Sequence, residues 1–299
     1  MSQRDLRTKI SSTQNIRKIT RAMEMVSAAR LRRAEQRIAS LRPYAGAIRR
    51  MTRQAAEAAG GISSLPILSE HESEQNIAIL LVTADRGLAG AFNAQIVRAG
   101  IQAADQYIAE GKQVTYYATG RRGVSSLNFR KREPAGAYVG FTDRPGYANA
   151  RDIGEELIAA YVDGKVDRVE IFYNGYVSAL TQEVRRETLL PLQQATILEG
   201  TEEDDAGVEG DTGHHALVEY EPDPEIILER LIPDYVEISI FRALLESTAS
   251  EHGARMTAMR SASDNAGDLI SDYTLQMNRA RQAEITQEIL EVVGGAEAL

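Results

Sequence analysis

Histidine is the side chain whose chemistry is easiest to test in a sequence, because its imidazole binds metals and exchanges protons near neutral pH. The chain has four histidines: His71, His214, His215 and His252. The adjacent pair has no Asp, Glu or His partners at the spacing of a ligand set, and His252 falls on a helical stripe, where packing is the simpler role. No Ser-centred elbow and no Glu-x-x-His pattern occurs in the sequence. We therefore expect no catalytic residue, no cofactor and no metal site.

A Gly-rich turn follows the most apolar run of the chain. Residues 76–83 are typical of a strand covered on both faces, and residues 85–90 (Asp-Arg-Gly-Leu-Ala-Gly) turn the chain into a helical pattern. Backbone N–H groups at such a helix start can hold a phosphate. The spacing matches neither G-x-G-x-x-G nor G-x-x-x-x-G-K-[ST], and Gly120 with Gly123 is no closer. A structural tight turn is therefore favoured over a nucleotide site.

Strand and helix patterns alternate through the middle of the chain. This alternation predicts a small α/β domain with a mainly parallel, Rossmann-like sheet, which we place at residues 70–195. The expected strands are residues 76–83, 113–118, 168–173 and 181–189, and the expected helices are residues 91–108 and 147–162.

Residues 196–224 are expected to form an acidic loop and linker. Within them, residues 199–213 combine glycines with acidic side chains and cannot form a core. Their carboxylates lack the fixed spacing of an EF-hand, so the stretch resembles a calcium loop only in charge. We assign this stretch no role.

Each end of the chain is a long helical pattern. Residues 1–57 and 225–299 are the expected helices, and at about 1.5 Å per residue their periodic parts would be roughly 80 Å and 100 Å long. A compact domain of the middle's size has a radius of gyration of only about 15 Å. Such a domain cannot bury either helix, so the ends must act against something else.

Both terminal helices carry apolar or small residues at three-four spacing. We expect the two stripes to meet in a long antiparallel coiled coil, with two separate helices of an ordinary bundle as the alternative. Pro43 lies inside the first pattern, and because the pattern continues beyond it we expect a bend there and not an end. The first stripe consists of Ile16, Ile19, Met23, Val26, Leu31, Ala34, Ile38, Leu41, Ala45 and Ile48. The second consists of Ile238, Phe241, Leu245, Thr248, Met256, Met259, Ala262, Ala266, Leu269, Tyr273, Met277 and Ala280.

Charge is divided unevenly along the 299 residues, whose net charge is −9. Residues 1–57 hold fourteen Lys and Arg against four acidic residues, a net of +10, so the remainder carries −19. A basic rod can bind nucleic acid, anionic lipid or acidic protein loops, or it can pair with the acidic second helix. The chain has no Cys, no apolar run of membrane-spanning length and no signal peptide. We expect a protein that is soluble or at most peripheral to a membrane.

Several motifs, in order along nearly the whole chain, closely resemble the gamma subunit family of F-type ATP synthases. The C-terminal segment Ile285-Thr286-x-Glu288-x-x-Glu291-x-x-x-Gly295-Ala296 is similar to that family's signature. The other similar segments are residues 19–30, 85–90, 221–224, 254–259 and 278–283.

The resemblance implies a central shaft. In the family, the terminal helices form an asymmetric coiled coil inside a ring of three alpha and three beta subunits. The α/β domain sits below, with the epsilon subunit, on a membrane ring of c subunits. Proton or sodium flow turns the shaft, and the shaft drives each beta subunit through its states. The chain itself would then be non-catalytic and would bind no nucleic acid. It would be held at the cytoplasmic face of the energy-transducing membrane only through the complex.

The resemblance also implies a set of partner-contact residues. Arg281 and Gln282 would hydrogen-bond a catch loop of beta, with Thr286, Glu288 and Glu291 close by. Arg255 and Met23 would lie near the same contact region. For Met23 the alternative is packing in the helix seam, and for the two glutamates it is solvation of the helix.

Two other classes of protein stay open at this point. A nucleic-acid-binding coiled coil would explain the basic first helix, but base-stacking aromatics normally accompany such charges and residues 1–57 offer only Tyr44. An α/β enzyme with a helical oligomerisation arm would explain the middle, but it would need a competent site.

Overall fold

The computed structural model describes residues 3–58, 67–68, 71, 73–192 and 223–297, so the acidic stretch at 199–213 with His214 and His215 lies outside the described residues. The helices are α1 (Gln3–Ala58), α2 (Phe92–Ala109), α3 (Arg121–Phe129), α4 (Tyr147–Val162) and α7 (Pro224–Glu297). The strands are β1 (Asn76–Val82), β2 (Gln113–Thr119), β3 (Gly136–Tyr138), β4 (Arg168–Tyr176) and β5 (Gln182–Leu190). The long helix α1 continues through Pro43 without interruption.

The five strands form one sheet in the order β3-β2-β1-β4-β5. β1 pairs in parallel with β2 and with β4, β2 pairs in parallel with β3, and β5 is antiparallel to β4. The expected Rossmann-like α/β fold is confirmed. Every residue of β1 after Asn76 is buried, as its nearly continuous apolar sequence predicts for a central strand.

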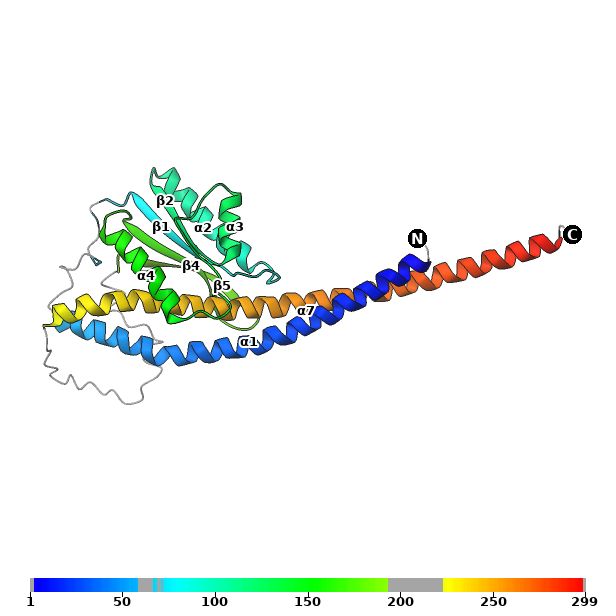
Figure 1. The fold of residues 1–299 in the computed structure, drawn as a ribbon, viewed down its shortest axis with the longest axis horizontal. Helices are drawn as coiled ribbons and strands as arrows, with labels where there is room; N and C mark the ends of the chain where they lie inside the picture. The colour runs from blue at the N-terminus through cyan, green and yellow to red at the C-terminus, as the bar shows by residue number, and fades with distance from the viewer. Residues whose placement is uncertain (1–2, 59–66, 69–70, 72, 193–222, 298–299) are drawn as a thin grey trace. The chain divides into compact units, whose positions relative to one another are not determined.

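Alternate side chains of β1 enter two different cores, because successive residues of a strand point to opposite faces. Ile77, Ile79 and Leu81 pack with residues of α2 and α3. The intervening Ala78, Leu80 and Val82 pack with residues of α4 and α7. Figure 1 shows α2 and α3 on one side of the sheet and α4 on the other. The sheet is therefore the middle layer of a three-layer domain, and α7 is part of one outer layer.

The chain divides into two compact units. We call residues 30–254 the core unit; it holds the sheet, its helices and the adjoining parts of α1 and α7. We call residues 1–29 and 255–299 the coil unit; it holds the two remaining helical parts.

Within the coil unit the two helices run antiparallel, as expected. Arg260 Nε lies 2.9 Å from Glu24 Oε1, and a Cβ placed on Gly267 would lie 3.5 Å from the guanidinium carbon of Arg17. Lys9 Nζ is 5.6 Å from the ring centroid of Tyr273. The α1 number falls as the α7 number rises, in steps of about one heptad.

The expected seam is wrong in part of the coil unit. Ile16, Ile19 and Val26 are each more than half exposed. The buried positions on this part of α1 are Leu6, Thr20 and Ser27, and those on α7 after Arg255 are Met259, Ser263 and Ala266. Leu6, Thr20 and Ser27 share one heptad face, and small side chains at the seam let the helix backbones approach closely. On α7, Leu269 was expected in the seam but is exposed.

In the core unit the expected stripe is confirmed. Ala45 and Ile48 of α1 pack with Leu231 and Ile238 of α7 in one hydrophobic cluster. Leu31 and Ala34 are also buried. Apolar residues therefore join the helices in the core unit, whereas the buried set of the coil unit mixes Leu6 and Met259 with small or polar residues.

Two elements were not expected from the sequence. Helix α3 follows Gly120 and contains Gly123, Ser125 and Ser126, which are poor helix formers. Strand β3 has only three residues, too few for a periodic pattern.

Candidate partner-contact surfaces

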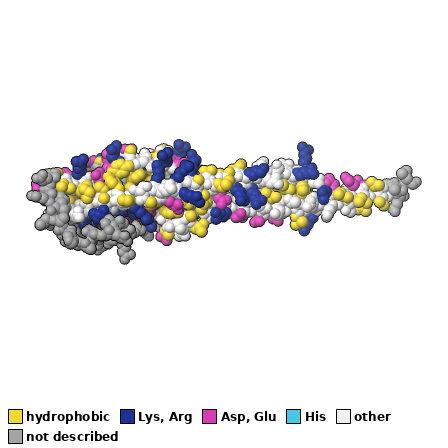
Figure 2. Space-filling view, turned by 90° about the horizontal axis from the view of Figure 1, so that it is seen from below, with side chains coloured by type: hydrophobic (Ala, Val, Ile, Leu, Met, Phe, Trp, Pro, Cys, Tyr) yellow, Lys and Arg dark blue, Asp and Glu magenta, His cyan; other side chains and the backbone are white. Residues whose placement is uncertain are grey.

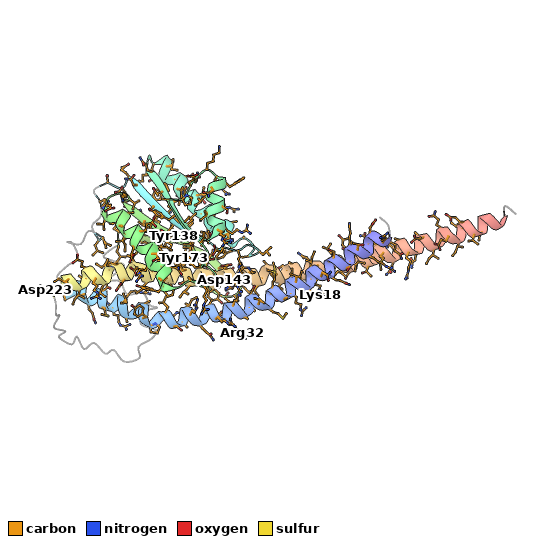
Figure 3. The ribbon with its side chains drawn as sticks, viewed as in Figure 1. Lys18, Arg32, Tyr138, Asp143, Tyr173 and Asp223 are labelled. Atoms are coloured by element: carbon orange, nitrogen blue, oxygen red, sulfur yellow. The ribbon has the colours of Figure 1, made fainter. Side chains whose placement is uncertain are left out.

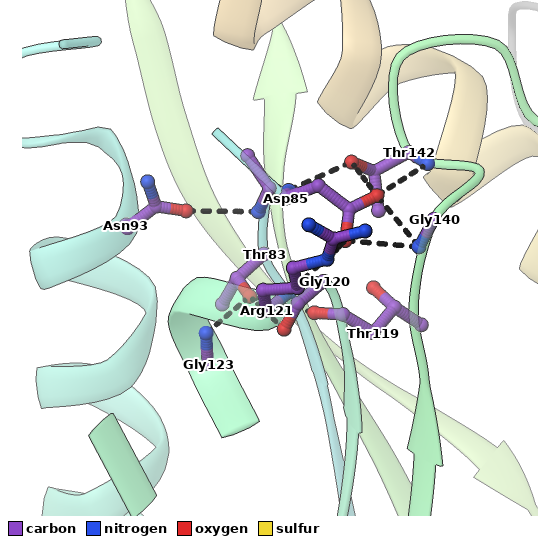
Figure 4. A network of polar contacts seen from close by, with 10 residues as sticks. Thr83, Asp85, Asn93, Thr119, Gly120, Arg121, Gly123, Gly140 and Thr142 are labelled. Atoms are coloured by element: carbon purple, nitrogen blue, oxygen red, sulfur yellow. Dashed lines mark hydrogen bonds and ion pairs between the residues drawn. The ribbon is translucent and has the colours of Figure 1, made fainter. Parts of the chain in front are cut away.

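The carboxyl ends of β1 and β4 mark the place where open α/β sheets usually bind ligands, because the order of the strands reverses there. In this chain a carboxylate of the protein lies beside that place, just beyond β1 (Figure 4). Asp85, just beyond β1, accepts hydrogen bonds from the backbone N–H of Gly140 at 2.9 Å, of Thr142 at 3.2 Å and of Arg121 at 3.1 Å. The hydroxyl of Thr142 donates a fourth bond at 3.0 Å.

Burial acts to raise the pKa of the Asp85 carboxyl, but the donors from Gly140, Thr142 and Arg121 outweigh it and hold the pKa below its usual range. The start of α3 is therefore already satisfied: Arg121 N–H bonds Asp85, and Gly123 N–H bonds Thr83 Oγ1 at 2.8 Å. A phosphate placed here would meet a fixed negative charge and no free donor from these groups. The Gly-rich turn of residues 85–90 thus acts as a structural element.

Helix α7 lies across the same edge of the sheet. Ser247 Oγ donates to the carbonyl of Val82 at 3.5 Å, and Ser250 Oγ donates to the carbonyl of Asn174 at 3.1 Å. These two hydroxyls reach the ends of β1 and β4, between which the strand order reverses. The helix therefore occupies the position that a ligand takes in nucleotide-binding members of this fold class.

The C-terminal part of α7 carries the residues expected to contact a partner. Every residue from Arg281 to Val293 is exposed. In the coil unit Leu6 is still buried, but α1 begins at Gln3, so in the antiparallel register α1 ends opposite about residue 280 of α7. Arg281, Gln282, Thr286, Glu288 and Glu291 therefore lie beyond the end of α1.

The described hydrogen bonds of this segment stay within the helix. Thr286 Oγ1 donates to the carbonyl of Gln282 at 2.8 Å, and Gln287 Nε2 lies 3.1 Å from Glu291 Oε1. Both are one-turn contacts of an exposed helix face. They leave the apolar side chains of the same turns uncovered.

Sequence reasoning missed those apolar side chains. Ile285, Ile289, Leu290, Val292 and Val293 are between 47% and 72% exposed. Figure 2 shows hydrophobic side chains at the surface along this part of α7. The signal was available, because their three-four spacing continues past the point where α1 can cover it.

Met23 and Arg255 lie elsewhere in the coil unit. Met23 is half-buried and adjoins Glu24, which pairs with Arg260, while Arg255 is buried. Arg255 and Arg281 are 26 residues apart on one helix, a distance of about 40 Å. The structure thus separates the predicted contact residues into a group at the end of α7 and a group near Met23.

A second exposed apolar set accompanies the Met23 group. Ile16, Ile19, Met25 and Val26 of α1 are each more than half exposed. Exposed basic residues lie among them, including Arg17, Lys18 and Arg21. Figure 3 shows Lys18 on this part of α1. An apolar face bordered by cations fits a partner surface that is both apolar and acidic.

The described part of the chain holds neither a metal-ligand cluster nor a membrane-spanning helix. No group of three or more His, Asp or Glu side chains in the described part of the chain is arranged to hold a metal ion. Among the same residues, no helix is both long enough and apolar enough to cross a bilayer.

Two long antiparallel helices and a Rossmann-like domain whose ligand position is filled by protein define an α/β protein with a coiled coil. The family model for ATP synthase matches residues 2–299. The ATP synthase gamma chain of Rubrobacter xylanophilus is 44% identical over 298 residues, covering 100% of this chain and 98% of that one. The gamma chain of Frankia casuarinae is 42% identical over 300 residues, covering 99% and 97%. The chain belongs to the ATP synthase family, among its gamma chains.

Solved structures agree on the fold. A chain in the Euglena gracilis mitochondrial ATP synthase, solved as OSCP/F1/c-ring, matches with a TM-score of 0.67 at 18% identity, covering 99% of this chain and 94% of that one. A chain of the Tetrahymena thermophila central stalk/c-ring structure matches with a TM-score of 0.59 at 24% identity, covering 82% and 99%.

Proposed function

We propose that this chain is the central rotating shaft of an F1Fo ATP synthase. It carries rotation between an ion-driven ring in the membrane and the nucleotide-binding subunits, and it is itself a non-catalytic subunit of the complex. The observation that carries the proposal is the end of α7, whose exposed apolar residues continue for more than three turns beyond the start of α1.

A single helix with exposed apolar side chains is stable only when another protein surface packs against them. Isolated helices of this length are marginal in water, because most helical stability in proteins comes from packing of an apolar face. Ile285, Ile289 and Val293 project from one side of the segment at four-residue spacing. A closed ring of alpha and beta subunits would surround the segment and cover this side in every rotational position.

The proposed electrostatic partner of α1 is an acidic segment of the beta subunit. Exposed cations recur along α1 from Arg4 through Arg21, and they accompany the exposed Ile16 and Ile19. Complementary charge fixes register and accelerates encounter more than it adds affinity. Loss of one cation would then change how the shaft engages beta more than whether it binds.

Arg281 and Gln282 would form the catch contact with beta, with Thr286, Glu288 and Glu291 beside them. All five lie on the exposed end of α7, where a partner can reach them. Met23 would act about five turns or more away from this end, and Arg255, being buried, would support the local shape of the coil.

A single chain inside a ring of three alpha and three beta subunits must present a different side to each beta. The coil unit meets this requirement, since the apolar positions Ile16 and Ile19 mark one side of α1 and the cations Arg17 and Arg21 another. Rotation would bring each side to each beta subunit in turn. Chemistry would occur on beta, and this chain would supply the sequence of contacts.

The core unit would sit with the epsilon subunit on the ring of c subunits, through which protons or sodium ions flow. The chain would then be peripheral to the energy-transducing membrane, at its cytoplasmic face.

Assembly is the experiment that tests this proposal. The chain, produced together with alpha and beta subunits, is expected to copurify with the hexamer at one copy per six subunits. The isolated chain is expected to show neither ATP turnover nor micromolar ATP binding. Failure to join the hexamer, or hydrolysis by the chain alone, would contradict the proposal.

A further inference from the structure

One loop of the core unit contacts both long helices at the same level. Residues 139–146 connect β3 to α4, and Thr142 and Asp143 lie at their centre. Asp143 accepts two hydrogen bonds from Arg30 Nη1 of α1, each at 2.6 Å. His252 Nε2 of α7 lies 3.7 Å from the same carboxylate. Figure 3 shows Asp143 beside the long helices.

Thr142, the residue before Asp143 in the loop, is hydrogen-bonded to α7. The hydroxyl of Thr248 donates to the carbonyl of Thr142 at 3.0 Å, and Thr248 is buried. Two adjacent loop residues therefore hold α1 and α7 together.

The loop is fixed in turn to the central strand of the sheet. Thr142 donates to Asp85 through its N–H at 3.2 Å and through its hydroxyl at 3.0 Å, and its hydroxyl accepts the N–H of Asp85 at 2.8 Å. Gly140 N–H adds a bond to the same carboxylate. Asp85 lies three residues after Val82, the buried last residue of β1. A continuous path of short contacts thus runs from Arg30 through Asp143 and Thr142 to β1.

The polar character of this path matters because the buried apolar residues beside Arg30, Leu31 and Ala34, belong to none of the hydrophobic clusters of the core unit. The clusters of the core unit reach α1 at Leu41, Ala45, Ile48, Ala55 and Ala56. Arg30 lies about 22 Å from Ala45 along the helix. Near Arg30, the described contacts of α1 with the sheet and its loops are the Asp143 ion pair and a hydrogen bond from the hydroxyl of Tyr176 to Glu35.

We propose that the Arg30–Asp143 ion pair is a torque link, a positioning contact through which the sheet holds α1 against displacement when the shaft turns under load. This inference rests on the proposed function of the chain as a rotor. The core unit ends at Arg30 on α1 and at Ala254 on α7, so the link acts at the last turns of both helices that belong to this unit. The two ends of the path are both fixed. Asp143 binds the guanidinium of Arg30 at one end through charge-assisted hydrogen bonds, and the other end is attached to β1.

The test uses the complete membrane complex, reconstituted in vesicles, with Arg30→Gln, with Asp143→Asn, and with the exchange of Arg30→Asp together with Asp143→Arg. The matched control is Asp105→Asn, which removes an equally short ion pair, 2.6 Å to Arg132, that does not involve α1 or α7. ATP hydrolysis and ion pumping are measured together against an increasing opposing ion gradient. The readout is slip, the fraction of hydrolysis that occurs without ion transport.

Each single variant is expected to raise slip about fivefold at the steepest gradient. This change corresponds to a loss of about 1 kcal/mol in the free energy that holds α1 in place against the sheet. Hydrolysis without a gradient is expected to stay within twofold of the unaltered complex, because the altered side chains touch no catalytic subunit in the proposed assembly. The exchange variant is expected to recover most of the coupling, and the control to match the unaltered complex.

Slip in either single variant that equals that of the control would overturn the torque link. Failure of the exchange variant to recover, or failure of all Arg30 and Asp143 variants to assemble, would make the pair a simple stability contact and would overturn the link as well. A complex with the unaltered chain that hydrolyses ATP but never pumps ions would instead contradict the proposed function.

Discussion

At the scale of single residues, Asp85 fixes the turn after β1 to the segments that follow β2 and β3. Its carboxylate accepts hydrogen bonds from the N–H groups of Gly140, Thr142 and Arg121. In a nucleotide-binding protein of this fold, N–H groups at a helix start bind the phosphate. Helices α3 and α7 thereby become linked to the end of β1 through protein contacts alone. The same carboxylate connects the sheet, through Thr142, to α7.

Asp85→Asn is expected to lower the free energy of unfolding by about 1–3 kcal/mol at neutral pH, because an amide NH₂ would face N–H donors that now meet a charged oxygen. The folded pKa of Asp85 is lowered, so its stabilising effect is present above the unfolded pKa, near 4, and is lost as pH falls through the folded pKa. Urea unfolding of the isolated chain from pH 7 down to pH 3 measures the difference.

The matched control for this measurement is Asp163→Asn, since Asp163 is exposed and pairs with an exposed Lys165. This control is expected to change stability little at any pH. A destabilisation by Asp85→Asn that stays constant down to pH 3 would show that the lost contact is not the charged carboxylate.

At the scale of elements, the two long helices change their mode of contact along their length. In the core unit, Ala45 and Ile48 pack with Leu231 and Ile238, as in an ordinary hydrophobic seam. In the coil unit, Thr20, Ser27 and Ser263 are buried while Ile16 and Ile19 face outward. Side chains that could stabilise the isolated coil are thus directed to its surface, where a partner can use them.

The antiparallel register predicts a specific disulfide. Thr20 and Ser263 are both buried, and they lie between the Glu24–Arg260 contact and the approach of Arg17 to Gly267. Cysteines at Thr20 and Ser263 are therefore expected to cross-link within one molecule under mild oxidation, in a chain that has no other cysteine. Non-reducing electrophoresis and peptide mass mapping detect the product.

Cysteines at Ile19 and Ser263 form the matched control, because Ile19 faces outward. This pair is expected to stay reduced within a molecule. Preferential cross-linking of the Ile19 pair would show that the apolar seam predicted from periodicity is the correct one. Cross-links that form only between molecules would contradict an intramolecular coiled coil.

The proposed catch contact predicts a kinetic effect without an assembly effect. Arg281→Ala with Gln282→Ala should slow ATP hydrolysis of the complex by roughly ten- to a hundred-fold, since hydrogen bonds to charged groups are worth about 1.5–3 kcal/mol and each 1.4 kcal/mol is a factor of ten. The rest of the interface should keep the complex together, because distributed packing survives loss of a few polar contacts. Size-exclusion chromatography and steady-state hydrolysis measure the two effects.

Gln276→Ala with Arg279→Ala is the control pair, with the same residue types exposed on the same helix. This pair should leave turnover nearly unchanged. Equal slowing by both pairs would indicate a general effect of helix charge, and normal turnover with the first pair would remove the catch role.

Periodicity predicted the elements that are long and regular. Residues 147–162 were expected as a helix and form α4, and the run at 76–83 was expected as a strand and forms β1. The pattern failed at Ile16, Ile19 and Val26, because an apolar side chain at the surface of a helix can follow the same spacing as one that faces the chain's own core.

The hydrogen bonds at the carboxyl ends of the strands could not be predicted from the sequence. Asp85 and Thr142 are 57 residues apart, and no local rule joins a turn after one strand to a loop after another. The partner-contact residues, Arg281 and Gln282 among them, came from the resemblance to a family. The structure places them on an exposed helix end, and their role stays a prediction.

At the scale of the whole molecule, positive charge is concentrated in the N-terminal helix of an acidic chain. Residues 1–57 carry a net charge of +10, although the whole chain carries −9. The exposed cations of α1 lie beside exposed apolar residues in the coil unit, and the ion pairs of the core unit lie mostly within its own domain. The coil unit therefore presents cations and apolar residues at its surface, whereas the ion pairs of the core unit join its own elements.

Rotation of this chain inside its complex is the most direct test of the account. Phe129, which is 87% exposed on the core unit, can be replaced by cysteine in a chain that has no other and labelled with a bead, while the beta subunits are fixed to a surface. We expect stepwise rotation in one direction that requires ATP and stops when ATP is removed. A bead that stays still, or that only fluctuates without direction, while the same complexes hydrolyse ATP would contradict it.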